Sequence, residues 1–145
     1  MNYQIINKNL MIVSLDKGDF VNKSIKDIFI KEKLTCGWVS GIGAVFNVEI
    51  GYYDINTKQY FKKKYLEEYE LTSLNGNITF ADSEHFVHTH VTLSDNEFNC
   101  FGGHLFDAQI AAAGEFKIDL ISDPIIRKFS QNVGLNLWCL NNEKN

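Results

Sequence analysis

Residues 86–105 of the chain read FVHTHVTLSDNEFNCFGGHL, and this segment gives the clearest local indication of the fold. Two stretches rich in β-forming residues, 86–93 and 98–105, flank a polar run at residues 94–97. Such a run between two strand-like stretches favours a turn. The segment therefore predicts two antiparallel strands joined by a short loop.

Three of the four histidines lie in this hairpin, at His88, His90 and His104. Residues i and i+2 of a strand point to the same face about 6.5–7 Å apart, so His88 and His90 can converge on one ion. A loop centred on Asn96 places His104 opposite His88, and a loop centred on Glu97 places it opposite His90. Either loop puts all three imidazoles on one face.

Two alternatives remain open for this register. A loop with an even number of residues would send His104 to the other face of the hairpin. Gly102 and Gly103 could introduce a β-bulge that shifts the register by one residue, and they could also leave room for an ion or ligand beside bare backbone. The alignment of the three rings is therefore a prediction that depends on the loop.

Three neutral imidazoles suit Zn²⁺ and other borderline divalent ions, and zinc is the metal expected here. Three protein ligands leave a fourth position for water or a ligand carboxylate. The alternative is that these histidines are hydrogen-bonded surface or interface side chains. Cys100 shares the strand face of His104 but lies about 13 Å along it, too far for a fourth ligand. His85 has the opposite strand parity, so we expect it to be exposed and uninvolved.

The rest of the chain predicts an α+β fold with a largely antiparallel sheet. One main helix is expected after a turn and N-cap at residues 17–19, because Val21, Ile25, Ile28 and Phe29 form an apolar stripe that fades by about residue 33. A short C-terminal helix is expected at residues 125–132, with Gly134 as its stop. With the hairpin, about seven strands are predicted. One is a short strand within residues 36–43 that opens into a glycine-rich bend, and the others lie at residues 10–15, 46–52, 69–80, 86–93, 98–105 and 109–121.

Length and composition predict a single domain over residues 1–140, followed by a frayed tail at residues 141–145. The chain has 145 residues, 45% of them hydrophobic and 22% charged. Its three cysteines, Cys36, Cys100 and Cys139, are odd in number and widely spaced, which argues against a disulfide framework. The first apolar stretch, residues 10–15, is too short for a signal peptide, and no stretch approaches a membrane span, so a cytoplasmic protein is expected.

The charge balance argues against direct DNA binding by this chain. The formal net charge is −4, and one arginine, Arg127, stands against thirteen lysines. Recognition of guanine and phosphate relies largely on arginine. The only basic cluster, Lys62–Lys64, is followed closely by glutamates, and we interpret it as a solvated turn or strand end.

The sequence resembles the plants and prokaryotes conserved (PPC) domain over nearly its whole length. Three blocks carry the resemblance, in matching order and spacing: Glu70–Ile78, His88–Asp95 and Gly102–Leu105. The resemblance implies an α+β fold with an antiparallel sheet, a homotrimer and, as in prokaryotic members, a metal site at His88, His90 and His104. The family is linked to DNA binding through plant members, which bind A·T-rich DNA with a separate AT-hook that this chain lacks.

Two segments depart from the family pattern. Residues 67–72 read EEYELT, whereas plant members carry Gly-Arg-Phe-Glu-Ile-Leu, a segment tied to partner binding. Asp107 and Ala108 stand where members often have a glycine. The fold should tolerate both changes, but the loss of the arginine puts the partner role in question.

These observations favour a trimeric metal-binding, ligand-binding or regulatory module over an enzyme. The alternative is a zinc-dependent hydrolase or lyase acting on a small molecule, in which bound Zn²⁺ lowers the pKa of water. Such an enzyme needs a general base near the ion. Its candidates, which the sequence does not place, are Glu84, Glu97, Asp107 and Glu115.

Overall fold

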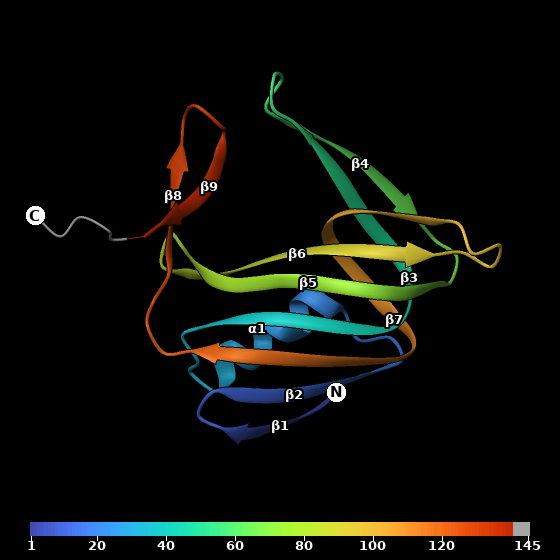
Figure 1. Cartoon of the computed structure of the whole chain (residues 1–145), viewed down its shortest axis with the longest axis horizontal. Coiled ribbons are helices and arrows are strands. Elements are labelled where there is room, and N and C mark those ends of the chain that lie inside the picture. Colours follow the sequence, from blue (N-terminus) through green and yellow to red (C-terminus); the bar gives the residue numbers. More distant parts are fainter. Residues whose placement is uncertain (141–145) are drawn as a thin grey trace, which may run out of the picture.

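A computed structural model describes residues 1–140 of the chain, and the predicted frayed tail, residues 141–145, lies outside the described residues. The described part contains one helix and nine strands (Figure 1). The elements are, in chain order, β1 (Asn2–Asn7), β2 (Leu10–Asp16), α1 (Val21–Lys31), β3 (Cys36–Asp54), β4 (Gln59–Tyr65), β5 (Tyr69–Ala81), β6 (Glu84–Ser94), β7 (Cys100–Ile121), β8 (Ile126–Ser130) and β9 (Leu135–Cys139). No helix in residues 1–140 is long and apolar enough to cross a membrane.

All nine strands belong to one sheet, with the main order β1-β2-β7-β3-β5-β8-β9. Every pairing is antiparallel except that of β5 with β8. Because β6 pairs with both β5 and β7, and β3 also pairs with both, these four strands form a closed ring of pairings. The long strands β3 and β7 make this possible, since each pairs with different neighbours along its length.

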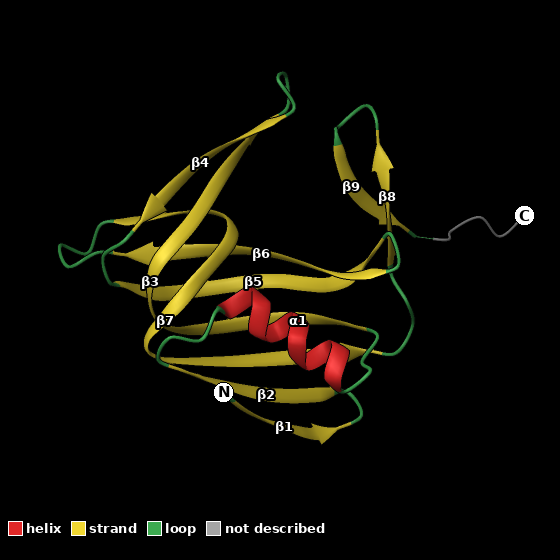
Figure 2. Ribbon diagram, turned by 180° about the vertical axis from the view of Figure 1, so that it is seen from behind, coloured by secondary structure: helices red, strands yellow, loops and turns green. Residues whose placement is uncertain are grey.

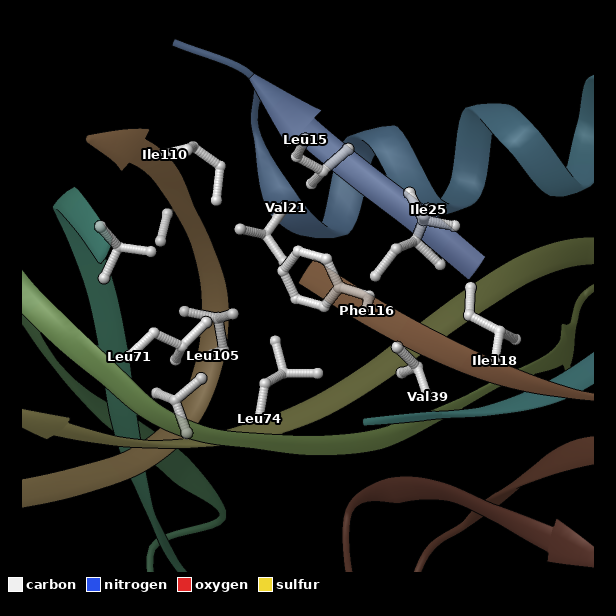
Figure 3. Packing of buried hydrophobic residues seen from close by; sticks show 14 of the residues in the cluster. Leu15, Val21, Ile25, Val39, Leu71, Leu74, Leu105, Ile110, Phe116 and Ile118 are labelled. Carbon is white, nitrogen blue, oxygen red and sulfur yellow. The ribbon is translucent and has the colours of Figure 1, made fainter. Parts of the chain in front are cut away.

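The helix α1 covers one face of the sheet (Figure 2). Its predicted apolar stripe is confirmed, because Val21, Ile25, Ile28 and Phe29 are all buried. Figure 3 shows Val21 and Ile25 pointing toward side chains of the sheet such as Phe116. Burial of this stripe stabilises the helix, which is too short to be stable alone.

The start of α1 differs from the prediction. The N-cap residue is Phe20, which makes no side-chain capping bond, while the Asp19 carboxylate accepts a hydrogen bond from the backbone N–H of Asp16. The helix is capped instead from β7. The Asp107 carboxylate accepts hydrogen bonds from the backbone N–H groups of Asn22, at 2.9 Å, and Lys23, at 3.3 Å. A residue distant in the sequence thus provides the acceptors that free helix N–H groups require.

The strand count of about seven was too low. Two pairs of expected strands each form one continuous strand, because β3 runs through the glycines at residues 41 and 43, and β7 runs through residues 106–108. Four strands were not expected as strands, namely β1, β4, β8 and β9. The lysine cluster at residues 62–64 lies within β4.

The short C-terminal helix predicted at residues 125–132 is wrong. Residues 126–130 form β8, which pairs with β9 and, at its first two residues, with the end of β5. Gly134, expected to stop the helix, instead lies in the β8–β9 turn with a φ of 80°. A helix of eight residues with two β-branched isoleucines has little intrinsic stability, so pairing with existing strands decides the structure.

Candidate metal centre

The hairpin of β6 and β7 has the register centred on Glu97. His90 pairs with His104, and Ser94 pairs with Cys100. The register centred on Asn96 is therefore excluded, and no bulge occurs in this pairing at Gly102 or Gly103. The Asp95 carboxylate fixes the loop by accepting hydrogen bonds from the backbone N–H groups of Glu97 and Asn99, each at 2.9 Å.

The orientation of the histidines is set from the opposite face of β6. Thr89 is fully buried, and its hydroxyl donates a hydrogen bond of 2.8 Å to the side-chain oxygen of Asn22 in α1. The amide of Asn22 donates to the backbone oxygen of Leu105 in β7. Because side chains alternate along a strand, locking Thr89 toward the helix directs His88 and His90 to the other side.

The structure brings His88, His90 and His104 together. One ring nitrogen from each lies within 4.8 Å of those of the other two. The Nε2 atoms of His88 and His90 are 3.2 Å apart, and the centroid of the His104 ring lies 5.2 Å from that of His88. The predicted convergence of the three imidazoles is present in the fold.

The surroundings of the cluster keep two of its rings neutral. Burial, followed by the charge of Arg127 and the proximity of His90, lowers the pKa of His88 to about 4. Burial, followed by the other two histidines and Lys62, lowers the pKa of His104 to about 4. A neutral imidazole has a free lone pair, so both rings are ready to bind a metal at neutral pH.

One polar atom of the cluster lacks a partner. Nδ1 of His104 is buried and makes no hydrogen bond within the described chain. The ring lies between aromatic neighbours, with centroids 5.0 Å from those of both Tyr60 and Phe106. A buried nitrogen without a hydrogen bond is costly, which makes it a natural point for an absent ligand or ion.

Arg127 is the residue at this site that sequence reasoning missed. It is 8% exposed, and its Nη2 atom lies 3.4 Å from Nδ1 of His88. Its guanidinium donates hydrogen bonds to Thr79, Asn77 and the backbone oxygen of Asn136. Burial lowers the pKa of Arg127 from its ordinary value. The sequence did single out Arg127, because it is the one arginine of the chain. The prediction of a helix at residues 125–132 did not place this arginine near the histidines.

A cavity of about 440 Å³ adjoins the cluster. Its lining includes His88 of β6, His104 of β7, Arg127 of β8 and Leu137 of β9. Tyr60 of β4 also reaches the cavity. The Tyr53 hydroxyl donates to the backbone oxygen of Val133 at 2.7 Å, so the β3–β4 and β8–β9 hairpins touch beside this space.

The other predicted residues lie outside the cluster. His85 is not a member, but its expected exposure is wrong. It is half-buried, its Nε2 is hydrogen-bonded to the backbone oxygen of Leu34 at 2.9 Å, and its ring packs near Phe80 and Phe29. Cys100 is exposed at the far end of the hairpin.

The four candidate bases have separate positions. Asp107 caps α1, and Glu84 forms an ion pair of 3.4 Å with Lys26. Glu97 lies in the hairpin loop, and Glu115 is exposed on β7. None of them lines the cavity beside the histidines.

Comparison with known proteins shows which family the chain resembles in sequence and fold. The family model of the Plants and Prokaryotes Conserved (PCC) domain, the PPC domain named above, matches residues 6–122. A plant- and prokaryote-conserved (PPC) protein from Pyrococcus horikoshii is 34% identical, with 90% of this chain and 91% of that chain covered and a TM-score of 0.84. Comparison with curated proteins gives no match.

Two further solved structures are similar over nearly their whole length. A metal-containing protein from Archaeoglobus fulgidus is 33% identical, with 97% of this chain and 99% of that chain covered and a TM-score of 0.84. A protein from Bacteroides thetaiotaomicron, provisionally described as DNA-binding, is 28% identical, with 95% and 96% covered and a TM-score of 0.91.

Proposed function

Because the chain belongs to the Plants and Prokaryotes Conserved (PCC) domain family and brings three imidazoles together, we propose that it is a metal-binding module of that family. One divalent ion, Zn²⁺, is held by His88, His90 and His104. The observation that carries this proposal is the convergence of one nitrogen from each ring within 4.8 Å. The description of the Archaeoglobus fulgidus relative as metal-containing supports it.

The residues fit zinc by distance and by chemistry. Zn–N bonds of 2.0–2.1 Å in tetrahedral geometry separate two ligand nitrogens by about 3.3 Å. The Nε2 atoms of His88 and His90 are already 3.2 Å apart. His88 and His104 are neutral at pH 7, as ligands must be, and the buried Nδ1 of His104 has no other partner in residues 1–140. Small movements of the rings would complete a three-nitrogen site.

A bound ion would act as a Lewis acid with an open fourth position for water or a small ligand. The alternative of a zinc-dependent hydrolase or lyase requires a general base, and no aspartate or glutamate of residues 1–140 lines the cavity. This observation favours ligand binding over catalysis.

The module is proposed to act as a homotrimer. The resemblance to the family implies this assembly, and the open face of the sheet offers apolar surface for it. Ile12 of β2 and Ile42 of β3 are 44% and 55% exposed and line one shallow hollow on that face. The free cysteines Cys36, Cys100 and Cys139 fit a cytoplasmic protein.

Elemental analysis of protein purified without an affinity tag tests the metal site. We expect one Zn²⁺ per chain in the wild type and strong loss of metal in His104→Ala and His90→Ala, because two imidazoles and water hold zinc poorly. His85→Gln is the matched control, since it removes a histidine outside the cluster and keeps a hydrogen-bonding group near Leu34. Full metal content in His104→Ala would refute the three-histidine assignment.

A further inference from the structure

The cavity beside the histidines combines an apolar wall with a positive charge. Side chains of Tyr60, Phe86, Phe106, Phe129 and Leu135 line much of its surface. Its volume of about 440 Å³ lies in the range of small-molecule sites, which are mostly apolar with a few polar groups that fix orientation. The wall therefore favours an apolar ligand body, with its polar part directed to the histidines and to Arg127.

Arg127 carries a buried charge without a counterion. All its close acceptors are neutral, namely the Thr79 hydroxyl, the Asn77 amide oxygen and the Asn136 backbone oxygen, each at 2.9 Å. Within residues 1–140, no aspartate or glutamate lies within ion-pair distance of its guanidinium. Buried charges are normally paired, so this site favours an anion supplied from outside.

Metal binding would strengthen this preference. One N–H of the Arg127 Nη2 atom points at Nδ1 of His88, at 3.4 Å. A neutral His88 that binds an ion through Nε2 must carry its proton on Nδ1. Two donors would then face each other across this contact, and one anionic oxygen can accept from both. The positive charge of a bound ion would also favour an anion at this position.

We infer that the cavity binds a small organic carboxylate with a flat apolar body, whose carboxylate lies between Arg127 and the histidine cluster. The apolar body lies against the aromatic wall. The part of this inference that concerns the ion rests on the proposed metal-binding function, whereas the pairing with Arg127 does not. Arg127 and the β8–β9 hairpin lie outside residues 6–122, the segment matched by the family model. The C-terminal hairpin thus adds the positive charge to a cavity whose Tyr60, Phe86 and Phe106 side chains lie within the matched segment.

Calorimetric titration of the full chain, with and without stoichiometric Zn²⁺, tests the inference with benzoate as the probe. Benzamide has the same flat ring without the charge, and acetate has the charge without the ring. We expect both to bind about tenfold or more weakly than benzoate, because a charge-assisted pair and a buried ring each contribute at least that factor. Equal affinities for benzoate and benzamide would overturn the proposed role of charge. Equal affinities for benzoate and acetate would overturn the role of the aromatic wall.

Substitution of the arginine gives a second measurement. Arg127→Met should weaken benzoate binding about tenfold or more, while the zinc content stays at that of the wild type. Lys128→Gln is the matched control, since it removes a neighbouring positive charge from an exposed side chain of the same strand. Unchanged benzoate affinity in folded Arg127→Met would overturn the inference. If Arg127→Met fails to fold, the three probes on the wild type still decide the question.

The two proposals fail in different ways. Stoichiometric zinc with no benzoate binding would overturn the carboxylate site and leave the metal centre intact. Benzoate binding that depends on Arg127 in a protein unable to retain zinc would refute the metal centre and support the carboxylate site. Elemental analysis and calorimetry thus separate the two.

Discussion

Replacement of Asp107 tests how the fold holds the helix against the hairpin. In α1 the N-cap residue provides no side-chain acceptor, and the first turn contains no acidic residue. The carboxylate of Asp107 on β7 takes this role for the N–H groups of Asn22 and Lys23. Loss of a capping group destabilises a protein by about 0.5–2 kcal/mol, and the loss of a partner for the partly buried N–H of Asn22 adds to this. We expect Asp107→Ala to lower the free energy of unfolding by about 2–3 kcal/mol.

Asp107→Asn should be much milder. Burial raises the pKa of Asp107 and outweighs the backbone hydrogen bonds that would lower it, so the fold disfavours the negative charge. Asparagine keeps one acceptor oxygen and removes that charge, so we expect a change within about 1 kcal/mol. Because the pKa of Asp107 is higher in the folded protein than in the unfolded chain, the folded protein binds the proton at a higher pH. The wild type should therefore gain stability relative to Asp107→Asn as the pH falls through the folded pKa toward about 3.8.

Urea denaturation of metal-free protein, followed by circular dichroism at one fixed protein concentration, measures these differences. Glu115→Ala is the control, because it removes an exposed carboxylate from the same strand. If Asp107→Asn were as destabilising as Asp107→Ala, the charge of Asp107 and not its acceptor atoms would cap the helix, which would refute the proposed capping role. The zinc content of all three variants should match the wild type, since none of these residues lines the cavity.

Three further outcomes are expected. Acid should destabilise the metal-free protein. The pKa values of His88 and His104 are about 4 in the folded protein and about 6.5 in the unfolded chain. The two rings therefore leave the free energy of unfolding unchanged above about pH 6.5 and lower it as the pH falls from 6.5 to 4. The loss is about 1–3 kcal/mol for each ring, measured by urea denaturation across this range. Light scattering at micromolar concentration should give the mass of a trimer, and a monomer mass would contradict the proposed assembly. Duplex DNA should bind weakly and without A·T preference in an anisotropy titration at physiological salt, because a net charge of −4 leaves little counterion release to drive association.

The β6–β7 hairpin could be predicted because all of its signals are local. Strand-forming residues flank a short polar loop, and the parity of His88, His90 and His104 follows from the loop length. The pattern left open whether the loop is odd or even, whether Gly102 and Gly103 form a bulge, and which of the two odd registers occurs. The register depends on Asp95, whose carboxylate binds N–H groups two and four residues ahead and so fixes the centre of the loop at Glu97.

The C-terminal hairpin could not be predicted because its partners are distant in the sequence. Arg127 is positioned by Thr79, 48 residues earlier, and β8 lies parallel to the end of β5. The residues that flank 125–132 do not distinguish a helix from a strand. The turn at Asp123–Pro124 and the glycine at 134 fit the two ends of either element. The cap of α1 was missed for the same reason, because Asp107 accepts hydrogen bonds from helix residues 84 and 85 positions earlier in the sequence.

The position of the single arginine explains how an acidic chain can still select anions. Charges exposed on the surface are screened by salt within about 10 Å, and there the net charge of −4 disfavours a long polyanion such as DNA. Arg127 is instead 8% exposed beside a largely apolar cavity, where its field is screened far less. The positive charge of Arg127 therefore attracts an anionic group that is small enough to enter the cavity. The net surface charge thus disfavours DNA while the buried Arg127 favours a small carboxylate, and raising the salt concentration distinguishes the two kinds of binding. Benzoate affinity should change little between about 50 and 200 mM salt, whereas residual DNA binding should decrease steeply.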